Sequence, residues 1–283
     1  MNTQLALDLA PRAPLVVAYG MGVDSTAMLV GMHARGIRPD LILFADTGSE
    51  KPETYAYLPV INAWLRSVGF PEVEVVRYVP QRFKNGAYAT LHDNCLVNET
   101  LPSITFGRKS CSLKWKRAPQ DARVRRWEPA KAAWAAGLKV TKAIGYDNGP
   151  IDSKRAWKVT DDAEYHYIYP LRDWGWNREE CERQIAAAGL PVPMKSACFM
   201  CASSKPAEID WLVENHPELA AVIVDMEKRF APHSRGVEGL WRREVKGTRG
   251  GIAKPGSMTA YIGQRLTLPV IQPEAADCSA DCF

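Results

Sequence analysis

A glycine-containing turn between two apolar runs is the feature that most constrains how this chain can fold. Residues 14–30 read PLVVAYGMGVDSTAMLV, which predicts a buried strand over 15–19, a tight turn at Gly20 and Gly22, and a helix from about Ser25. Glycine lets the backbone come close to an anion, and the first N–H groups of the following helix point at it. The turn is therefore suited to hold phosphate. An ordinary strand-to-helix connection is the alternative interpretation.

The residues after the second glycine separate this turn from two common phosphate-binding motifs. No Gly-Lys-Ser/Thr follows it, as a Walker loop requires, and Asp24 and Ser25 interrupt the pattern of the dinucleotide fingerprint. Kinase-like and ordinary dinucleotide-binding functions are therefore weaker hypotheses. Ser25 and Thr26 add hydroxyl donors at the same place.

Strand and helix patterns alternate through the first part of the chain. Short apolar runs predict strands at 41–45, 73–79, 139–145 and 165–171, and apolar residues at helical spacing predict a helix over 52–68. This alternation predicts an α/β fold with a doubly wound, mainly parallel sheet. Ligands of such sheets bind at the carboxyl ends of the strands, where the glycine turn lies.

The second half of the chain is mainly helical by its pattern. We expect helices over 118–136, 206–215 and 217–230, and one from the N-cap Asn177 to Ala188, whereas 80–110 shows no period. The expected organisation has four parts. They are an N-terminal tail (1–13), a nucleotide-binding α/β domain (14–175), a helical, cysteine-bearing extension of the same domain (176–230), and an irregular C-terminal segment and tail (231–283).

Composition indicates a globular protein. Hydrophobic residues make up 46% of the 283 residues, no apolar run reaches 18 residues, and the first residues lack the basic start of a signal peptide. We therefore expect a cytoplasmic protein without a membrane partner. The net charge is +4, but basic residues concentrate at 108–126 and 242–254. Each stretch is either a solvated surface or a surface for nucleic acid or substrate phosphates.

The seven cysteines point to metal or redox chemistry, because disulfides are rare in a reducing compartment. Cys198 and Cys201 form a C-x-x-C on an expected loop, and two thiolates so spaced can share a metal, share a cluster face or form a redox pair. A zinc ribbon needs a second close pair, whereas Cys95 and Cys111 are sixteen residues apart.

Two of these motifs together resemble a known superfamily. GMGVDS (20–25) resembles the S-G-G-x-D-S pyrophosphate loop of the adenine nucleotide alpha-hydrolases, and ADTGSEKPETY (45–55) resembles the second-strand motif of their sulfonucleotide (PAPS) reductase branch. Gly20 and Met21 replace the family's Ser and Gly, and Val23 replaces a frequent Lys. The resemblance implies a Rossmann-type α/β fold.

The resemblance also implies a nucleotide site. ATP or another adenine nucleotide would lie against two strand-end motifs and the partly matching segment after the fourth strand, with Mg²⁺ present if ATP is cleaved. Asp24 would be catalytic. The implied binding residues are Gly20, Met21, Gly22, Val23, Asp24, Ser25, Asp46, Thr47, Gly48, Gly145, Asp147 and Arg155.

The sequence also resembles the iron–sulfur sulfonucleotide reductases and the related DNA phosphorothioation sulfurtransferases, which hold a [4Fe–4S] cluster beside the nucleotide. The resemblance implies that Cys111, Cys198 and Cys201 are its ligands here, with zinc or free thiols as alternatives. The fourth ligand is Cys95, Cys181, a tail cysteine or nothing. Cys181 lies among glutamates, which favours an inert thiol.

Three functions follow as hypotheses. The first is a PAPS reductase-like enzyme that binds an adenine nucleotide and uses the cluster for sulfur transfer, with a sulfur or electron donor protein as a further partner. The second is a true APS or PAPS reductase that releases sulfite, with Cys282 or Cys278 as the nucleophile. The third is a catalytically idle nucleotide sensor or scaffold.

Overall fold

The computed structural model describes residues 12–108, 110–247 and 253–267. Contacts divide the chain into two compact units. The first comprises residues up to 98 and 102–201, and the second comprises 99–101 and the residues after 201. This boundary falls inside the expected extension 176–230, so its first helix belongs to the first unit and its later helices to the second. None of the described helices is long and apolar enough to cross a membrane.

The first unit contains a five-stranded sheet, and all its strands are parallel. In chain order the strands are β1 (Leu15–Tyr19), β2 (Leu41–Asp46), β3 (Val73–Arg77), β4 (Val140–Ile144) and β5 (Tyr165–Ile168). Their order in the sheet is β3-β2-β1-β4-β5. The order reverses between β1 and β4, which makes the carboxyl ends of these two strands the switch point of the sheet. The predicted doubly wound α/β fold is confirmed.

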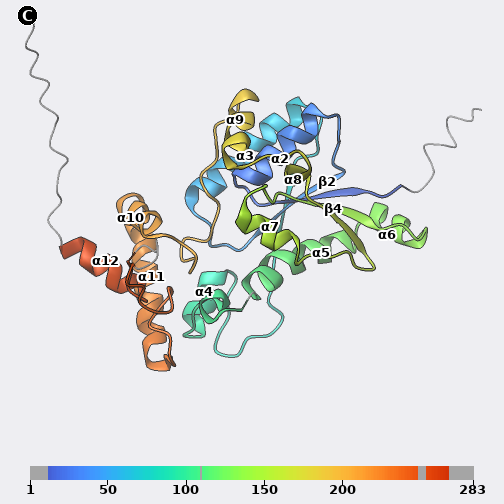
Figure 1. The fold of residues 1–283 in the computed structure, drawn as a ribbon. Coiled ribbons are helices and arrows are strands. Elements are labelled where there is room, and N and C mark those ends of the chain that lie inside the picture. Colours follow the sequence, from blue (N-terminus) through green and yellow to red (C-terminus); the bar gives the residue numbers. More distant parts are fainter. Residues whose placement is uncertain (1–11, 109, 248–252, 268–283) are drawn as a thin grey trace, which may run out of the picture. The chain divides into compact units, whose positions relative to one another are not determined.

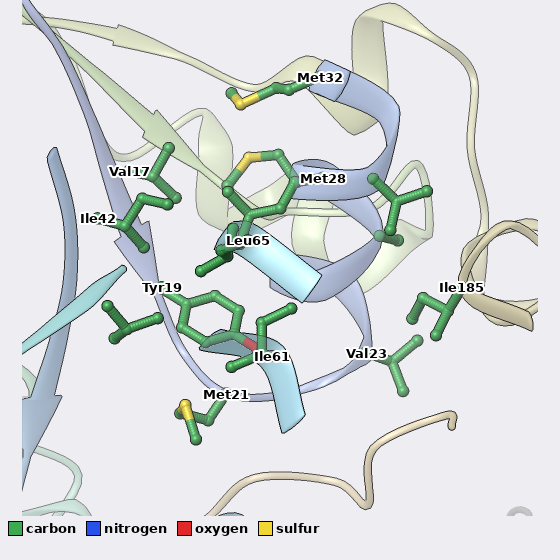
Figure 2. Close-up of a cluster of buried hydrophobic side chains, with 14 of the residues drawn as sticks. Val17, Tyr19, Met21, Val23, Met28, Met32, Ile42, Ile61, Leu65 and Ile185 are labelled. Atoms are coloured by element: carbon green, nitrogen blue, oxygen red, sulfur yellow. The ribbon is translucent and has the colours of Figure 1, made fainter. Parts of the chain in front are cut away.

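Helices cover both faces of the sheet (Figure 1). On one face lie α2 (Val23–Ala34), α3 (Pro52–Ser67) and α9 (Arg178–Ala187), and they bury an apolar cluster with β1 and β2. Figure 2 shows this cluster in close-up. Its labelled members are Val17, Tyr19, Met21, Val23, Met28, Met32, Ile42, Ile61, Leu65 and Ile185.

The opposite face is covered by α5 (Ala118–Val124) and α6 (Glu128–Ala135). The single helix expected over 118–136 is thus two helices, because Trp127 is extended and Pro129 cannot donate a backbone hydrogen bond. Trp127 and Trp134 pack against the sheet as expected. A π-helix, η2 (Cys111–Arg117), precedes α5.

Several short helices were missed by the sequence reading. The segment 80–110 contains α4 (Leu91–Val97) and the 3₁₀ turn η1 (Ser103–Phe106), while α7 (Pro150–Ala156) and α8 (Pro170–Asp173) follow β4 and β5. Helices of one or two turns are too short to show a 3.6-residue period. For α4 the local signal is its capping box, in which Thr90 and Asp93 bond each other's backbone.

The second unit is helical. Its helices α10 (Pro206–Asn215) and α11 (Pro217–Phe230) match the prediction, and η3 (Ala231–His233) follows. The expectation of an irregular segment after 231 is wrong for α12 (Met258–Thr267). The buried carboxylate of Glu227 on α11 accepts the N–H groups of Met258 and Thr259, so α12 is capped from 31 residues away, where no local pattern reveals it.

Candidate functional site

The turn after β1 is built from backbone. Gly22 is the extended N-cap of α2, and none of the described side chains caps this helix. The Ser25 hydroxyl accepts the Gly20 N–H at 3.2 Å and donates to the Gly22 carbonyl at 3.1 Å, which holds the turn closed. The first amides of α2 therefore face the carboxyl end of the sheet without a side-chain acceptor, the arrangement that suits an anion.

Met21 and Val23 contribute only backbone to this turn. Both side chains are buried members of the apolar cluster, and Figure 2 labels them. Met21 has a φ of 61°, a left-handed conformation that costs a non-glycine residue roughly 1 kcal/mol or more. The burial of the methionine side chain offsets part of this cost.

The end of β4 lies against the turn. A Cβ on Gly145 would lie 2.9 Å from Ser25 Cα and 3.0 Å from Ser25 N, so only glycine permits this approach. Asp147 accepts the Gly149 N–H at 2.8 Å and thereby shapes the loop into α7. Arg155 is 59% exposed and pairs with Asp152 at 2.9 Å.

Asp24 faces an arginine that the sequence reading missed. Arg178 Nη1 lies 3.0 Å from Asp24 Oδ1. Burial raises the pKa of Asp24, Arg178 opposes the rise, and Asp147 and Asp152 add to it. Arg178 follows the N-cap of α9 and belongs to no motif, so only the packing of α9 on α2 brings it here.

The turn after β2 is built from side chains instead. The Asp46 carboxylate is 1% exposed and accepts three bonds: from Gly48 N at 2.7 Å, Tyr55 Oη at 2.8 Å and Arg77 Nε at 2.8 Å. These bonds occupy its oxygens, so Asp46 positions the turn and presents no free oxygen at the strand end.

Two distant segments dock on residues 47–50 of this turn. The C-x-x-C loop does so through Phe199 N, which donates to Ser49 O at 2.9 Å, and through Cys198 Sγ, which lies 3.2 Å from Thr47 Oγ1. Helix α4 does so through Leu91 N, which donates to Thr47 O at 2.9 Å. The turn therefore fixes both segments at one strand end.

Four of the predicted or candidate thiols gather around this turn. Burial raises the pKa of Cys198 to about 12, Glu50 adds to the rise, and Lys116 and the contact with Thr47 oppose it. Burial also raises the pKa of Cys95, and the thiols of Cys111 and Cys198 raise it further. Cys201 N donates to Cys198 O at 3.0 Å. A charge on one of these thiols therefore disfavours a charge on the next.

A buried carboxylate beside the thiols was also missed. Glu50 is 0% exposed in its side chain, and its Oε1 accepts from Lys116 Nζ at 2.9 Å. Its Oε2 is buried without a hydrogen-bond partner. Burial lowers the pKa of Lys116, but Glu50 and the thiols of Cys198 and Cys201 raise it more, so the ammonium stays charged. A buried oxygen without a partner is costly unless another group satisfies it.

The remaining candidates lie elsewhere. Within the described residues no three Cys, His, Asp or Glu side chains are close enough to hold one metal ion. Cys181 is buried in α9 beside Asp24, and burial raises its pKa to about 12. Cys278 and Cys282 lie outside the described residues, as do residues 248–252 of the second basic stretch.

Carboxylates neutralise much of the first basic stretch. Four of the seven basic residues that the structure describes in this stretch are paired, namely Lys116 with Glu50, Arg117 with Asp121 and Asp162, Arg123 with Glu74, and Arg125 with Glu164. The stretch is therefore less positive than its sequence suggests.

Fold and site together define an α/β protein with a backbone-built turn at the switch point of its sheet and a group of thiols at the next strand end. No protein-family model matches the chain, and no curated protein matches it. Among solved structures it is similar to the U34-tRNA thiolase NcsA from Methanococcus maripaludis with its [4Fe-4S] cluster, at 14% identity and a TM-score of 0.37, over 87% of this chain and 84% of that one. A likeness this loose adds nothing about the activity or the site residues.

Proposed function

We propose that this chain is a PAPS reductase-like member of the adenine nucleotide alpha-hydrolases, and that it binds an adenine nucleotide and uses a [4Fe–4S] cluster for sulfur transfer. One observation carries the proposal. The glycine turn ends β1, the turn on which the C-x-x-C loop docks ends β2, and these strands are hydrogen-bonded neighbours running in the same direction. A nucleotide and a sulfur-handling group would therefore meet at one edge of the sheet.

The nucleotide would be held mainly by backbone. The amides of 20–25 would bind the phosphates, with Gly145, Asp147 and Arg155 on the β4 side and the segment 46–48 bordering the adenosine. Asp24 would ligate the Mg²⁺ that offsets a triphosphate's charge if ATP is cleaved, with Arg178 supplying positive charge beside it.

The thiol group fits an iron–sulfur cluster in its chemistry. Thiolates on one zinc ion lie about 4 Å apart, since each Zn–S bond is about 2.3 Å. A [4Fe–4S] cluster would take its thiolates at wider spacing than one zinc ion does. Cys111, Cys198 and Cys201 would hold the cluster, which when bound supplies iron for sulfur or electron chemistry. Lys116 would offset its negative charge.

The acceptor and the donor follow from the same proposal as expectations. The acceptor is a nucleic acid at the basic stretches or a small metabolite, the sulfur or electrons come from a donor protein, and we expect the chain to act in the cytoplasm.

One observation favours the idle nucleotide sensor as a second candidate. Met21 and Val23 give the turn no polar side chain, so binding without cleavage is the simplest outcome of its geometry.

Binding and turnover measured on one preparation test the proposal. We expect Mg–ATP or a sulfonucleotide to bind in calorimetry. We expect pyrophosphate to be released when an acceptor is supplied with ATP, or sulfite when a thiol reductant is supplied with a sulfonucleotide. Binding without any release supports the sensor, and no binding contradicts both. Deleting residues 274–283 separates transferase from reductase, because only a reductase that uses Cys278 or Cys282 loses all turnover.

A further inference from the structure

Cys95 is a buried thiol that the three-cysteine cluster site does not use. It lies on α4 and is 1% exposed. From the sequence alone, the fourth ligand of the cluster is Cys95, Cys181, a tail cysteine or no residue at all. The contacts of α4 distinguish among these.

The face of α4 that carries Cys95 is the face held on the β2 turn. Cys95 is four residues after Leu91, so the two lie on one side of the helix, and both are buried. Leu91 N bonds Thr47 O, and Thr47 Oγ1 touches Cys198 Sγ. His92 N donates to Ser49 Oγ at 3.0 Å, and the ring of His92 lies 5.4 Å from that of Phe199 in the C-x-x-C loop. These contacts hold α4 and the C-x-x-C loop side by side.

Cys111 reaches the same place from the chain that follows α4. Its N–H donates to Ser103 Oγ at 2.9 Å, and its Sγ lies 3.1 Å from that oxygen. The π-helix it begins carries Lys116, whose ammonium meets Glu50 beside Cys198.

Cys181 has different surroundings. It packs in the apolar cluster with Met28 and Ile185, and the charged groups near it are Asp24, Asp147 and Arg178 of the phosphate side. It therefore lies apart from the thiols at the β2 turn.

We infer that Cys95 is the fourth thiolate ligand of the cluster, on a helix that the Thr47–Glu50 segment holds against the C-x-x-C loop. This inference rests on the proposed function, since it needs the cluster to exist. Four cysteines complete the usual ligand set of a [4Fe–4S] cluster. With Cys95, the chain would supply one cysteine for each iron of the cluster.

The first test uses the unaltered protein, purified without oxygen and labelled with ⁵⁷Fe. A fully cysteine-ligated cluster gives Mössbauer spectra with no iron of distinct ligation and keeps about four irons through mild ferricyanide oxidation. A cluster with one open iron instead loses it and gives the paramagnetic three-iron form in electron paramagnetic resonance. That result would overturn the inference and leave the proposed function standing. Protein without iron would overturn both.

The second test compares Cys95→Ser with Cys181→Ser, which removes an equally buried thiol away from the turn. We expect Cys95→Ser to fall from about four to about three irons after oxidation and to show the three-iron signal, while Cys181→Ser behaves as the unaltered protein. Equal iron retention in both variants contradicts the inference. Circular dichroism of both proteins shows whether they are folded, and Cys95→Ala replaces Cys95→Ser if that variant is not.

Discussion

The turns after β1 and β2 lie at neighbouring strand ends but are built in opposite ways. The β1 turn uses glycines, a left-handed Met21 and one hydroxyl, and its side chains mostly enter the core. The β2 turn uses a saturated carboxylate and docks two distant segments through residues 47–50. The β1 turn leaves its backbone amides available to an anion. The β2 turn uses its polar groups to hold the thiol-bearing segments in place.

The two turns should therefore tolerate different kinds of substitution. A backbone-built turn depends on the absence of side-chain atoms, so added atoms should harm it most. A side-chain-built turn depends on each polar partner, so removed atoms should harm it most. Substitutions that add or remove atoms at each turn test this contrast.

Removing the Asp46 carboxylate should have the largest effect on folding. In Asp46→Ala the Tyr55 hydroxyl and the Gly48 N–H lose their acceptor, so we expect the free energy of unfolding to fall by about 2–4 kcal/mol in urea titrations. Asp225→Ala is the matched control, because it removes an exposed, ion-paired carboxylate and should cost less than about 1 kcal/mol. Equal losses in the two variants would show that the β2 turn does not depend on Asp46.

Adding one methyl group at the β4 end should damage the phosphate turn. Gly145→Ala places a Cβ against the backbone of Ser25, so we expect a loss of about 1–3 kcal/mol in stability and at least roughly tenfold weaker nucleotide binding. Gly263→Ala is the control, because a Cβ there would meet no atom of the described residues within 4 Å. Unchanged nucleotide affinity in Gly145→Ala contradicts the position assigned to the phosphates.

The burial of Asp24 should make the stability of the protein depend on pH. Its pKa is raised in the folded state, so the fold gains stability from this group below about pH 4 and loses that gain as pH rises through the raised value. Asp24→Asn should therefore have a higher Tm than the unaltered protein at pH 7, and the difference should vanish near pH 3. A lower Tm at pH 7 would show that the pair with Arg178 outweighs burial. Weaker Mg–ATP binding should accompany the substitution.

The paired basic residues should have the smallest effect. Arg125 is 58% exposed and bonds Glu164, so Arg125→Ala should change stability by less than about 1 kcal/mol. It should also leave the salt dependence of single-stranded RNA binding unchanged. The loss of a phosphate contact would instead lower the salt slope by about 1. A lower slope would show that Arg125 leaves Glu164 for nucleic acid.

Local sequence pattern predicted the elements that are long enough to carry a period. All five strands, α2, α3 and the helices at 206–230 follow from apolar spacing and caps. The short α4 and α7 carry no period. The site beyond its motifs depends on contacts across more than 60 residues, such as Lys116 with Glu50 and Arg178 with Asp24, which no local pattern encodes.

The central claim is that the thiols at the β2 turn hold an iron–sulfur cluster. Its most direct test is an assay of iron, sulfide and zinc with a visible spectrum on protein purified without oxygen. We predict about four irons and four sulfides per chain with broad visible absorption, all lost in Cys198→Ser. Zinc in place of iron, or no metal at these cysteines, would contradict the claim.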